Sequence, residues 1–405
     1  MFTVGFDTSA LDPTFKDHAA RGIGRYVREL THYFATCPDT KVKILPFDHH
    51  SLSPYRWVDH LLLGRQRLKQ QLLYPLQLGF GTRHGFDTVH FPAHMDAPSW
   101  SPCAYILTVL DLVPLVCADL YRSDQPSWRF RLARWLESRA IKNASLILAI
   151  SENTAQDVHH LLGVSPARIV VTPLGVSEKF FDPRLVENEV VLRQRYRIPP
   201  KRPVLLYVGG IDQRKNTWTL LEAFHIVLHA RRVSGGTLPV LVMVGKIQHH
   251  QQFPKLKGLI HAKGLVGDVV LPGYIPDEDL LQLYCITSVC CFLSLYEGFG
   301  LPPLEAMAAG VPIVCSNTSS LPEVVGNAAA LVSPHDAELA AKTILRVLDD
   351  ATYAGFLSEC GRKRARLFPW SRTGATTLAA YERFAERQGP RLEYVQKPGI
   401  GYKSL

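Results

Sequence analysis

Short apolar runs alternate with segments of helical period along most of the chain, in two series separated by a proline-rich stretch at 197–203. Strands that alternate with helices in this way are typical of parallel sheets covered by helices. A chain of 405 residues is long enough for two domains of this kind. We therefore expect an α/β protein that consists of two parallel-sheet domains.

The positions of the apolar runs predict the individual elements. In the first series we expect strands at 3–6, 43–46, 88–91, 104–110, 146–150 and 169–172, with helices at 26–34 and 128–141. In the second series we expect strands at 204–208, 240–244, 269–271, 289–293 and 313–315, with helices at 217–230, 277–285, 304–309 and 337–348. Turn residues at 172–176 and 182–183 indicate the exit from the first domain.

The most informative segment is SLYEGFGLPPLEAMAAG at 294–310, in which a buried strand runs into a glycine-rich turn and then a helix. Gly298 and Gly300 permit close approach to the backbone, and free amides at the helix start would bind an anion. Glu297 and Glu305 flank this anion site. Carboxylates accept hydrogen bonds from hydroxyls, so the pattern indicates a ligand that carries both phosphate and sugar. The alternative is that Glu305 only complements the helix terminus and Glu297 is a solvated loop residue.

A second loop carries two adjacent cations at the end of an apolar strand. In LLYVGGIDQRKN, Gly209 and Gly210 end the strand, and Arg214 and Lys215 follow. The carboxyl ends of parallel strands are where such sheets bind ligands, and cations there can neutralise a diphosphate leaving group without a metal. We expect Lys215 to be exposed at the site. The alternative is a solvated basic turn in which Asn216 caps the next helix.

A third glycine-rich segment, ARGIGRY at 20–26, follows the first strand. Gly22 and Gly24 resemble a phosphate loop, but Val27 stands at the third glycine position of the dinucleotide fingerprint, and no acidic ribose partner is evident. A glycine turn without a ligand is therefore the alternative interpretation.

Together these segments resemble the large retaining family 4 of glycosyltransferases. Glu297 and Glu305, separated by seven residues in EGFGLPPLEAMAAG, look like its signature. The segments VGGIDQRKN, GYIPDEDLLQLY and SNTSSLPEVVGNAAALVSP match the same family in the same order. AISENT at 149–154 and PLGV at 173–176 are similar to the exit of its first domain. The similarity covers most of the chain and is densest from 204 to 334.

The resemblance implies the GT-B fold, in which two Rossmann-like domains face each other across a central cleft. It implies an acceptor domain at 1–180, a nucleotide-sugar donor domain at 181–375, and a last stretch at 376–405 whose helix returns to the first domain before a loose tail. The implied catalytic residues are Glu297, facing the transferred sugar, and Lys215 and Arg214, binding the diphosphate. The implied donor-binding residues are Glu305, on the ribose hydroxyls, and Gly298, Phe299, Gly300, Leu301, Gly209, Gly210, Gly22, Gly24 and Tyr274.

Two positions depart from the pattern of the family. Many relatives carry a histidine before the aspartate at the end of a first-domain strand, where this chain has Leu110. His90 or His94 could serve in its place, although a lone histidine at a strand end is more often structural. Many relatives also carry an arginine after the first glycine of VGG. Gly210 stands there, which shifts the expected phosphate contact to Arg214.

Charge and spacing constrain the partners further. The chain has a formal net charge of +9, which favours anionic partners, but no run of basic residues indicates nucleic-acid binding. Asp277, Glu278 and Asp279 have the spacing of a metal-binding motif. Acidic residues are nevertheless expected in the first turn of a helix. We therefore expect no cofactor and no catalytic metal.

Several features bear on location. No apolar stretch is long enough for a membrane helix, and the start of the chain lacks the pattern of a signal peptide. The eight cysteines form no CxxC pair, which favours reduced thiols in a cytoplasmic protein. Two basic, aromatic segments at 55–69 and 128–135 could lie on an acidic lipid surface. The alternative for both is an ordinary amphipathic helix packed on the first sheet.

We expect transfer of a hexose with retention, and mannose from GDP-mannose is the first donor. The GGIDQRKN and VLDLVPL segments look most like bacterial mannosyltransferases of surface-polysaccharide assembly, so the expected acceptor is a glycan or a lipid-linked saccharide. The alternatives are a UDP-hexose-dependent glycosyltransferase, a nucleotide-sugar epimerase on the same fold, and a sugar-nucleotide-binding protein without catalysis. Peripheral membrane association is a further expectation, and nucleic acid is not an expected partner.

Overall fold

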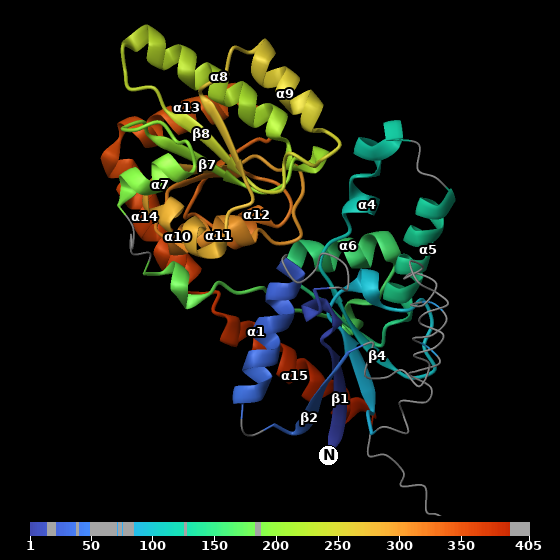
Figure 1. The fold of residues 1–405 in the computed structure, drawn as a ribbon. Helices are drawn as coiled ribbons and strands as arrows, with labels where there is room; N and C mark the ends of the chain where they lie inside the picture. Colours follow the sequence, from blue (N-terminus) through green and yellow to red (C-terminus); the bar gives the residue numbers. More distant parts are fainter. Residues whose placement is uncertain are drawn as a thin grey trace, which may run out of the picture.

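The computed structural model describes residues 1–13, 22–37, 40–48, 71, 75, 85–124, 128–182 and 188–388. The described part of the chain contains two six-stranded sheets, one in each half, with helices packed on their faces (Figure 1). The paired strands are parallel in both sheets. This is the two-domain α/β architecture that the alternation of strands and helices predicts.

The first sheet has the strand order β2-β1-β3-β4-β5-β6. Each strand predicted in this half is confirmed, with bounds within one residue of the prediction. The strands are β1 (Phe2–Asp7), β2 (Val42–Phe47), β3 (Thr88–Phe91), β4 (Tyr105–Val109), β5 (Leu146–Ala149) and β6 (Ile169–Val171).

The second sheet has the order β12-β11-β10-β7-β8-β9. The five predicted strands are confirmed within two residues, and the short edge strand β12 was not predicted. The strands are β7 (Val204–Val208), β8 (Val240–Val244), β9 (Val269–Gly273), β10 (Thr287–Phe292), β11 (Ile313–Ser316) and β12 (Ala330–Val332).

Helices connect the strands of both sheets. Those predicted are confirmed as α1 (Gly22–Thr36), α5 (Trp128–Asn143), α8 (Thr217–Ser234), α10 (Asp277–Cys285), α11 (Leu301–Ala308) and α13 (Ala337–Asp349), together with the last helix, α15 (Trp370–Gln388). Helices not predicted are α4 (Val113–Val116), α6 (Glu152–Leu162), α7 (Glu189–Arg195), α9 (Phe253–Ala262), α12 (Leu321–Val325) and α14 (Ala351–Ala365).

Three helices begin earlier than predicted, and one of them is α15, which begins at Trp370 and not at 376. α11 begins at Leu301 and not at 304, because Pro302 and Pro303 have the backbone angle of a helix and lack only amides that a first turn leaves free. α1 begins at Gly22, so the prediction of a glycine loop at Gly22 and Gly24 is wrong, and both residues lie in a helical turn. The helix is favoured there because the apolar residues of its next turn are fully buried.

α15 follows the second sheet in the sequence but packs on the first. Leu378, Tyr381 and Phe384 share one apolar cluster with Val4 and Ile106 of the first sheet. Where α15 crosses α1, a Cβ on Gly374 would lie 2.3 Å from the ring of Tyr33, so only glycine fits. The proposed boundary at 375 falls inside this helix, and the tail predicted at 390–405 lies outside the described residues.

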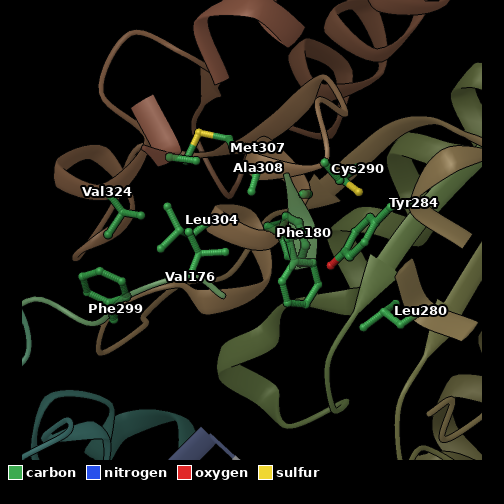
Figure 2. Close-up of a cluster of buried hydrophobic side chains, with 14 of the residues drawn as sticks. Val176, Phe180, Leu280, Tyr284, Cys290, Phe299, Leu304, Met307, Ala308 and Val324 are labelled. Carbon is green, nitrogen blue, oxygen red and sulfur yellow. The ribbon is translucent and has the colours of Figure 1, made fainter. Parts of the chain in front are cut away.

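The two domains meet at the carboxyl ends of their strands, as Figure 1 shows. Tyr296 Oη in the second domain donates to Asp157 Oδ2 in the first at 2.6 Å. Thr154 Oγ1 of the first domain donates to the carbonyl oxygen of Gly298 at 3.2 Å. A shared apolar cluster also joins α10 and α11 to the connection between the sheets, where Phe180 faces Tyr284 (Figure 2). The fold thus brings two loops of different domains to one place.

Candidate active site

The segment between β10 and α11 crosses the end of the second sheet. Gly300 has φ 112°, a conformation that other residues rarely adopt. It is the N-cap of α11, and no side chain caps the helix by a hydrogen bond. Pro302 and Pro303 have no amide hydrogen, and the amide of Leu304 donates to the carbonyl oxygen of Gly300 at 3.2 Å. The helix start can therefore offer an anion only the amides of Gly300 and Leu301, together with the attraction of the helix dipole.

Glu297 lies at the centre of a charged cluster directly before this helix. Lys215 Nζ donates to Glu297 Oε1 at 2.6 Å, and Arg214 Nη1 donates to Glu297 Oε2 at 2.9 Å. Ser294 Oγ donates to the same carboxylate at 2.7 Å, and the backbone amide of Glu297 donates to Ser319 Oγ at 2.9 Å. Burial would raise the pKa of Glu297, but the charges of Lys215 and Arg214 outweigh burial and lower it to about 2. The carboxylate is thus ionised, and the alternative of a solvated loop residue is wrong.

The loop after β7 places both cations. A single 3-10 turn at Gln213–Lys215 is capped by Asp212, whose carboxylate accepts from the amide of Arg214 at 3.1 Å. The next residue, Asn216, does not cap α8 with its side chain. Its amide instead donates to the carbonyl oxygens of Leu293 at 2.9 Å and Pro334 at 2.7 Å. These bonds fix the loop to the end of β10, beside Glu297.

The prediction that Lys215 is exposed is wrong. Its side chain is 16% exposed, because it lies beneath the loop and pairs with Glu297. Burial lowers the pKa of Lys215, although the charge of Glu297 opposes this shift. Burial also acts to lower the pKa of Arg214, but the charge of Glu297 outweighs it, so the pKa of Arg214 is raised. The alternative of a solvated basic turn is wrong for the same reason.

Glu305 lies one turn into α11, and its side chain is 5% exposed. Burial raises its pKa, and the charge of Arg25 opposes the rise. Arg25 Nη1 donates to Glu305 Oε1, and Arg25 Nη2 donates to Asp277 Oδ2 at 2.9 Å. Gly22 and Gly24 were predicted as site residues and Arg25 was not, although a cation beside a glycine-rich phosphate-like segment was a signal that could have found it.

The remaining predicted donor-binding residues differ in what they present. Phe299 is buried against Phe368, with ring centroids 5.9 Å apart, so only its backbone can face a ligand. Gly210 has open space where a Cβ would be, and Gly209 lies against the hydroxyl of Tyr207. Tyr274 is exposed at the end of β9. The roles proposed for all of these residues stay predictions.

Leu110, which stands where many relatives carry a histidine, is buried and lies against Gly298. The carbonyl oxygen of Leu110 lies 2.0 Å from where a Cβ on Gly298 would be. His90 is fully buried, with Nδ1 2.5 Å from Tyr381 Oη and Nε2 2.8 Å from Thr108 Oγ1, and burial lowers its pKa to about 3. His94 is buried beside Arg134 of α5. Both histidines therefore have the structural positions that the alternative interpretation predicts.

The acidic motif at the start of α10 does not form a cluster of free ligands. Its three residues occupy the first turn of the helix, as the helix-terminus interpretation predicts. Asp277 also pairs with Lys179 at 2.9 Å, and Asp279 pairs with Arg195 at 3.1 Å. Across the described ranges, no group of three or more histidine, cysteine or acidic side chains could hold a metal ion.

Comparison with known proteins agrees with this geometry. Residues 190–364 match the family described as glycosyl transferases group 1, and residues 20–180 match glycosyltransferase family 4. The chain is 30% identical to the O-antigen chain mannosyltransferase B of Escherichia coli, over 77% of this chain and 78% of that protein. It is 28% identical to the serotype-specific mannosyltransferase WbdA of Escherichia coli over 74% of this chain, which spans only 35% of WbdA.

A solved structure shows the same fold over nearly the whole chain. Sucrose-phosphate synthase from Thermosynechococcus elongatus superposes with a TM-score of 0.71 and 22% identity, covering 95% of this chain and 99% of that one. The order of the two sheets and their contact at the strand ends are those of the GT-B fold. The chain therefore belongs to the group 1 glycosyl transferases of glycosyltransferase family 4.

Proposed function

We propose that this chain transfers mannose from GDP-mannose to a saccharide acceptor, with retention of configuration and without a metal ion. The observation that carries the proposal is the cluster of Glu297, Lys215 and Arg214 at the uncapped start of α11. The two Escherichia coli relatives are both mannosyltransferases, which supports mannose as the sugar.

The cluster suits the departure of a nucleoside diphosphate. The bond between the anomeric carbon and the phosphate oxygen breaks, and its electron pair stays on the diphosphate. Once the donor is bound, Arg214, Lys215 and the amides at the start of α11, those of Gly300 and Leu301, would stabilise that charge, because donors already in place need no further reorganisation as the bond breaks. The acceptor hydroxyl attacks from the same face, and its proton passes to the departing phosphate oxygen. These steps need no metal, since the cations and amides supply the charge.

The two carboxylates suit different parts of the donor. Glu305 is buried in α11 and would accept hydrogen bonds from the ribose hydroxyls. Glu297 is held by two cations in front of the helix and would face the transferred sugar as positive charge develops on it. A diphosphate must compete with Glu297 for Lys215 and Arg214, so donor binding rearranges this cluster.

Calorimetry with nucleotides tests the donor. Wild-type protein titrated with GDP, UDP, ADP and their sugars should prefer GDP and GDP-mannose, with and without excess chelator. Preference for UDP and a UDP-hexose would replace mannose transfer with the UDP-dependent alternative. Binding that disappears with chelator would contradict the metal-independent site.

We also infer that the first domain rests on an acidic membrane surface. α5 buries only Ala133, Ala140 and Ile141 of its own residues. Trp128 and Trp135 are 64% and 55% exposed, beside Arg129 and Arg139. The helix therefore packs through these three aliphatic residues and directs aromatic and basic residues outward, which suits anionic lipid. The other candidate segment, 55–69, lies outside the described residues.

Vesicle sedimentation tests this inference. The chain should bind vesicles of phosphatidylglycerol but not of phosphatidylcholine, and replacing Trp128 and Trp135 with serine should weaken the binding. Phe356→Ser, at an exposed aromatic on α14, is the matched control. Equal binding by all three proteins would contradict a role for α5. Among the described residues, no helix is long and apolar enough to cross a membrane.

A further inference from the structure

Arg25 of the first domain reaches into the donor half of the site. It lies in the first turn of α1 and bridges Glu305 on α11 and Asp277 on α10. Its side chain is 22% exposed, so the guanidinium is held between the domains and is not a mobile surface group. A cation of the first domain is therefore paired with Glu305, the carboxylate that the proposed function assigns to ribose.

The starts of α1 and α11 also lie against each other. A Cβ on Gly22 would lie 3.6 Å from Leu301 Cδ1. Gly22 and Arg25 are three residues apart, so they share one face of α1. That face is turned toward the start of α11, which the proposed function assigns to the diphosphate. Arg25 thus contacts Glu305, the proposed ribose ligand, and lies within one helical turn of the residue that packs against the start of α11, the proposed diphosphate site.

Charge explains why Arg25 pairs with Glu305 in the empty protein. A buried carboxylate is costly unless a cation or several donors satisfy it. Arg25 satisfies Glu305, and the charges of Glu305 and Asp277 raise the pKa of Arg25 against the effect of burial. A ligand that takes Glu305 must supply hydrogen-bond donors and must also provide Arg25 with another anion.

We propose that Arg25 is a donor-binding residue that exchanges partners. It neutralises Glu305 while the site is empty and moves to the donor diphosphate when the ribose hydroxyls replace it. Ribose supplies neutral donors for the carboxylate, and the diphosphate supplies oxygens that fit the planar guanidinium. Asp277, which also pairs with Lys179, stays beside Arg25 in both states. The inference rests on the proposed function.

The exchange has a signature that a purely structural ion pair lacks. A nucleoside without phosphates must break the pair between Arg25 and Glu305 and offers no anion in return. A nucleoside diphosphate breaks the same pair and returns two phosphate groups. Arg25 should therefore oppose the binding of the nucleoside and favour the binding of the diphosphate.

The test compares Arg25→Gln with Arg28→Gln, a matched variant one turn further along α1 at an exposed position. Calorimetry gives the dissociation constants of guanosine and GDP for each protein, with uridine and UDP in parallel. Arg25→Gln should bind the nucleoside as well as the wild type or better and bind the diphosphate about tenfold or more weakly, because a charge-assisted contact is lost. Arg28→Gln should match the wild type with both ligands.

Two results would overturn the inference. An unchanged ratio of the two dissociation constants would show that Arg25 never reaches the diphosphate. Parallel weakening of both ligands would show that Arg25 only holds Glu305 in place. If Arg25→Gln does not fold, as judged by its melting temperature, Arg25→Lys serves instead. This variant should prefer GDP over guanosine less strongly than the wild type does. A wild type that binds no nucleoside diphosphate would overturn the proposed function as well, whereas a binding wild type with an unchanged ratio overturns this inference alone.

Discussion

Replacing Gly298 with alanine should hold the two domains apart. A Cβ at this position would lie 2.0 Å from the carbonyl oxygen of Leu110 and 3.0 Å from Cβ of Asp111. Both atoms belong to the segment after β4 of the first domain, so backbone and not a flexible side chain must give way. Carbon–oxygen contacts normally begin at about 3.3 Å, so the interface must open here by roughly 1.3 Å.

The opening should affect the rate far more than nucleotide binding. A misplacement of about 1 Å costs on the order of a hundredfold in rate when two reactants must be aligned, so we expect a loss of that size in kcat. The contacts proposed for the nucleotide lie mainly in the second domain, at Glu305 and Lys215, and stay in place. The dissociation constant of the nucleoside diphosphate should therefore change much less than kcat.

Kinetics and calorimetry on the same preparations provide the assay. Gly355→Ala is the control, because its Cβ would meet nothing within 4 Å on α14. Within a helix this change should add about 0.5–1 kcal/mol of stability without affecting transfer. If Gly298→Ala keeps a kcat near that of the control, the domains need not meet at Leu110. A loss in nucleotide affinity as large as the loss in kcat would refute the reasoning, because Gly298 would then hold the nucleotide as well as the contact between the domains.

Four further substitutions test the assigned roles. Glu305→Gln should weaken the binding of free nucleotide and of donor alike. Glu297→Gln should not weaken nucleotide binding, because its side chain no longer competes as a charge for Lys215 and Arg214, and should lower kcat about a hundredfold. Identical profiles from calorimetry and kinetics would show that the roles are misassigned. Lys215→Ala should weaken the nucleoside diphosphate between about tenfold and a hundredfold, since a charged hydrogen bond is lost, and unchanged affinity in calorimetry would remove Lys215 from the phosphate site. Tyr296→Phe removes only the hydrogen bond to Asp157 and should lower kcat with little change in nucleotide affinity, because the residue next to Glu297 is then no longer fixed by the first domain; an unaltered kcat would show that this bond does not position the loop.

The sequence predicts the fold well where a segment is long, apolar and central. β7 and β8 are found at their predicted bounds because each is a continuous apolar run that lies inside a sheet. β12 was missed because it has three residues at the edge of the sheet, too few to show a period. α6 was missed because its apolar residues are sparse, although Ser151 caps it by accepting from the amide of Thr154.

In the site, too, residues that belong to a local sequence pattern were predicted, whereas contacts between distant residues were not. Glu297, Arg214 and Lys215 were predicted from two separate loops, and the structure brings them into contact because both loops follow neighbouring strands of one parallel sheet. Their mutual ion pairing was not predicted, since a sequence does not show which partner an ionised group chooses in the absence of a ligand. The contact between Arg25 and Glu305 was not predicted because the two residues are 280 positions apart in different domains, and no local pattern reports such a contact, although the place of Arg25 beside Gly22 and Gly24 marked it as a candidate phosphate ligand.

The most direct measurement follows the sugar released from GDP-mannose by proton magnetic resonance. The reaction contains excess chelator and either a saccharide acceptor or water. The first product of the wild type should show the anomeric signal of the α form, which is also the form in the donor. Glu297→Gln should form this product about a hundredfold more slowly. A β anomer as the first product would contradict retention, and a strict requirement for added metal would contradict the role given to Arg214, Lys215 and the start of α11. The absence of any product from GDP-mannose, together with turnover of another nucleotide sugar, would contradict the assignment of the donor.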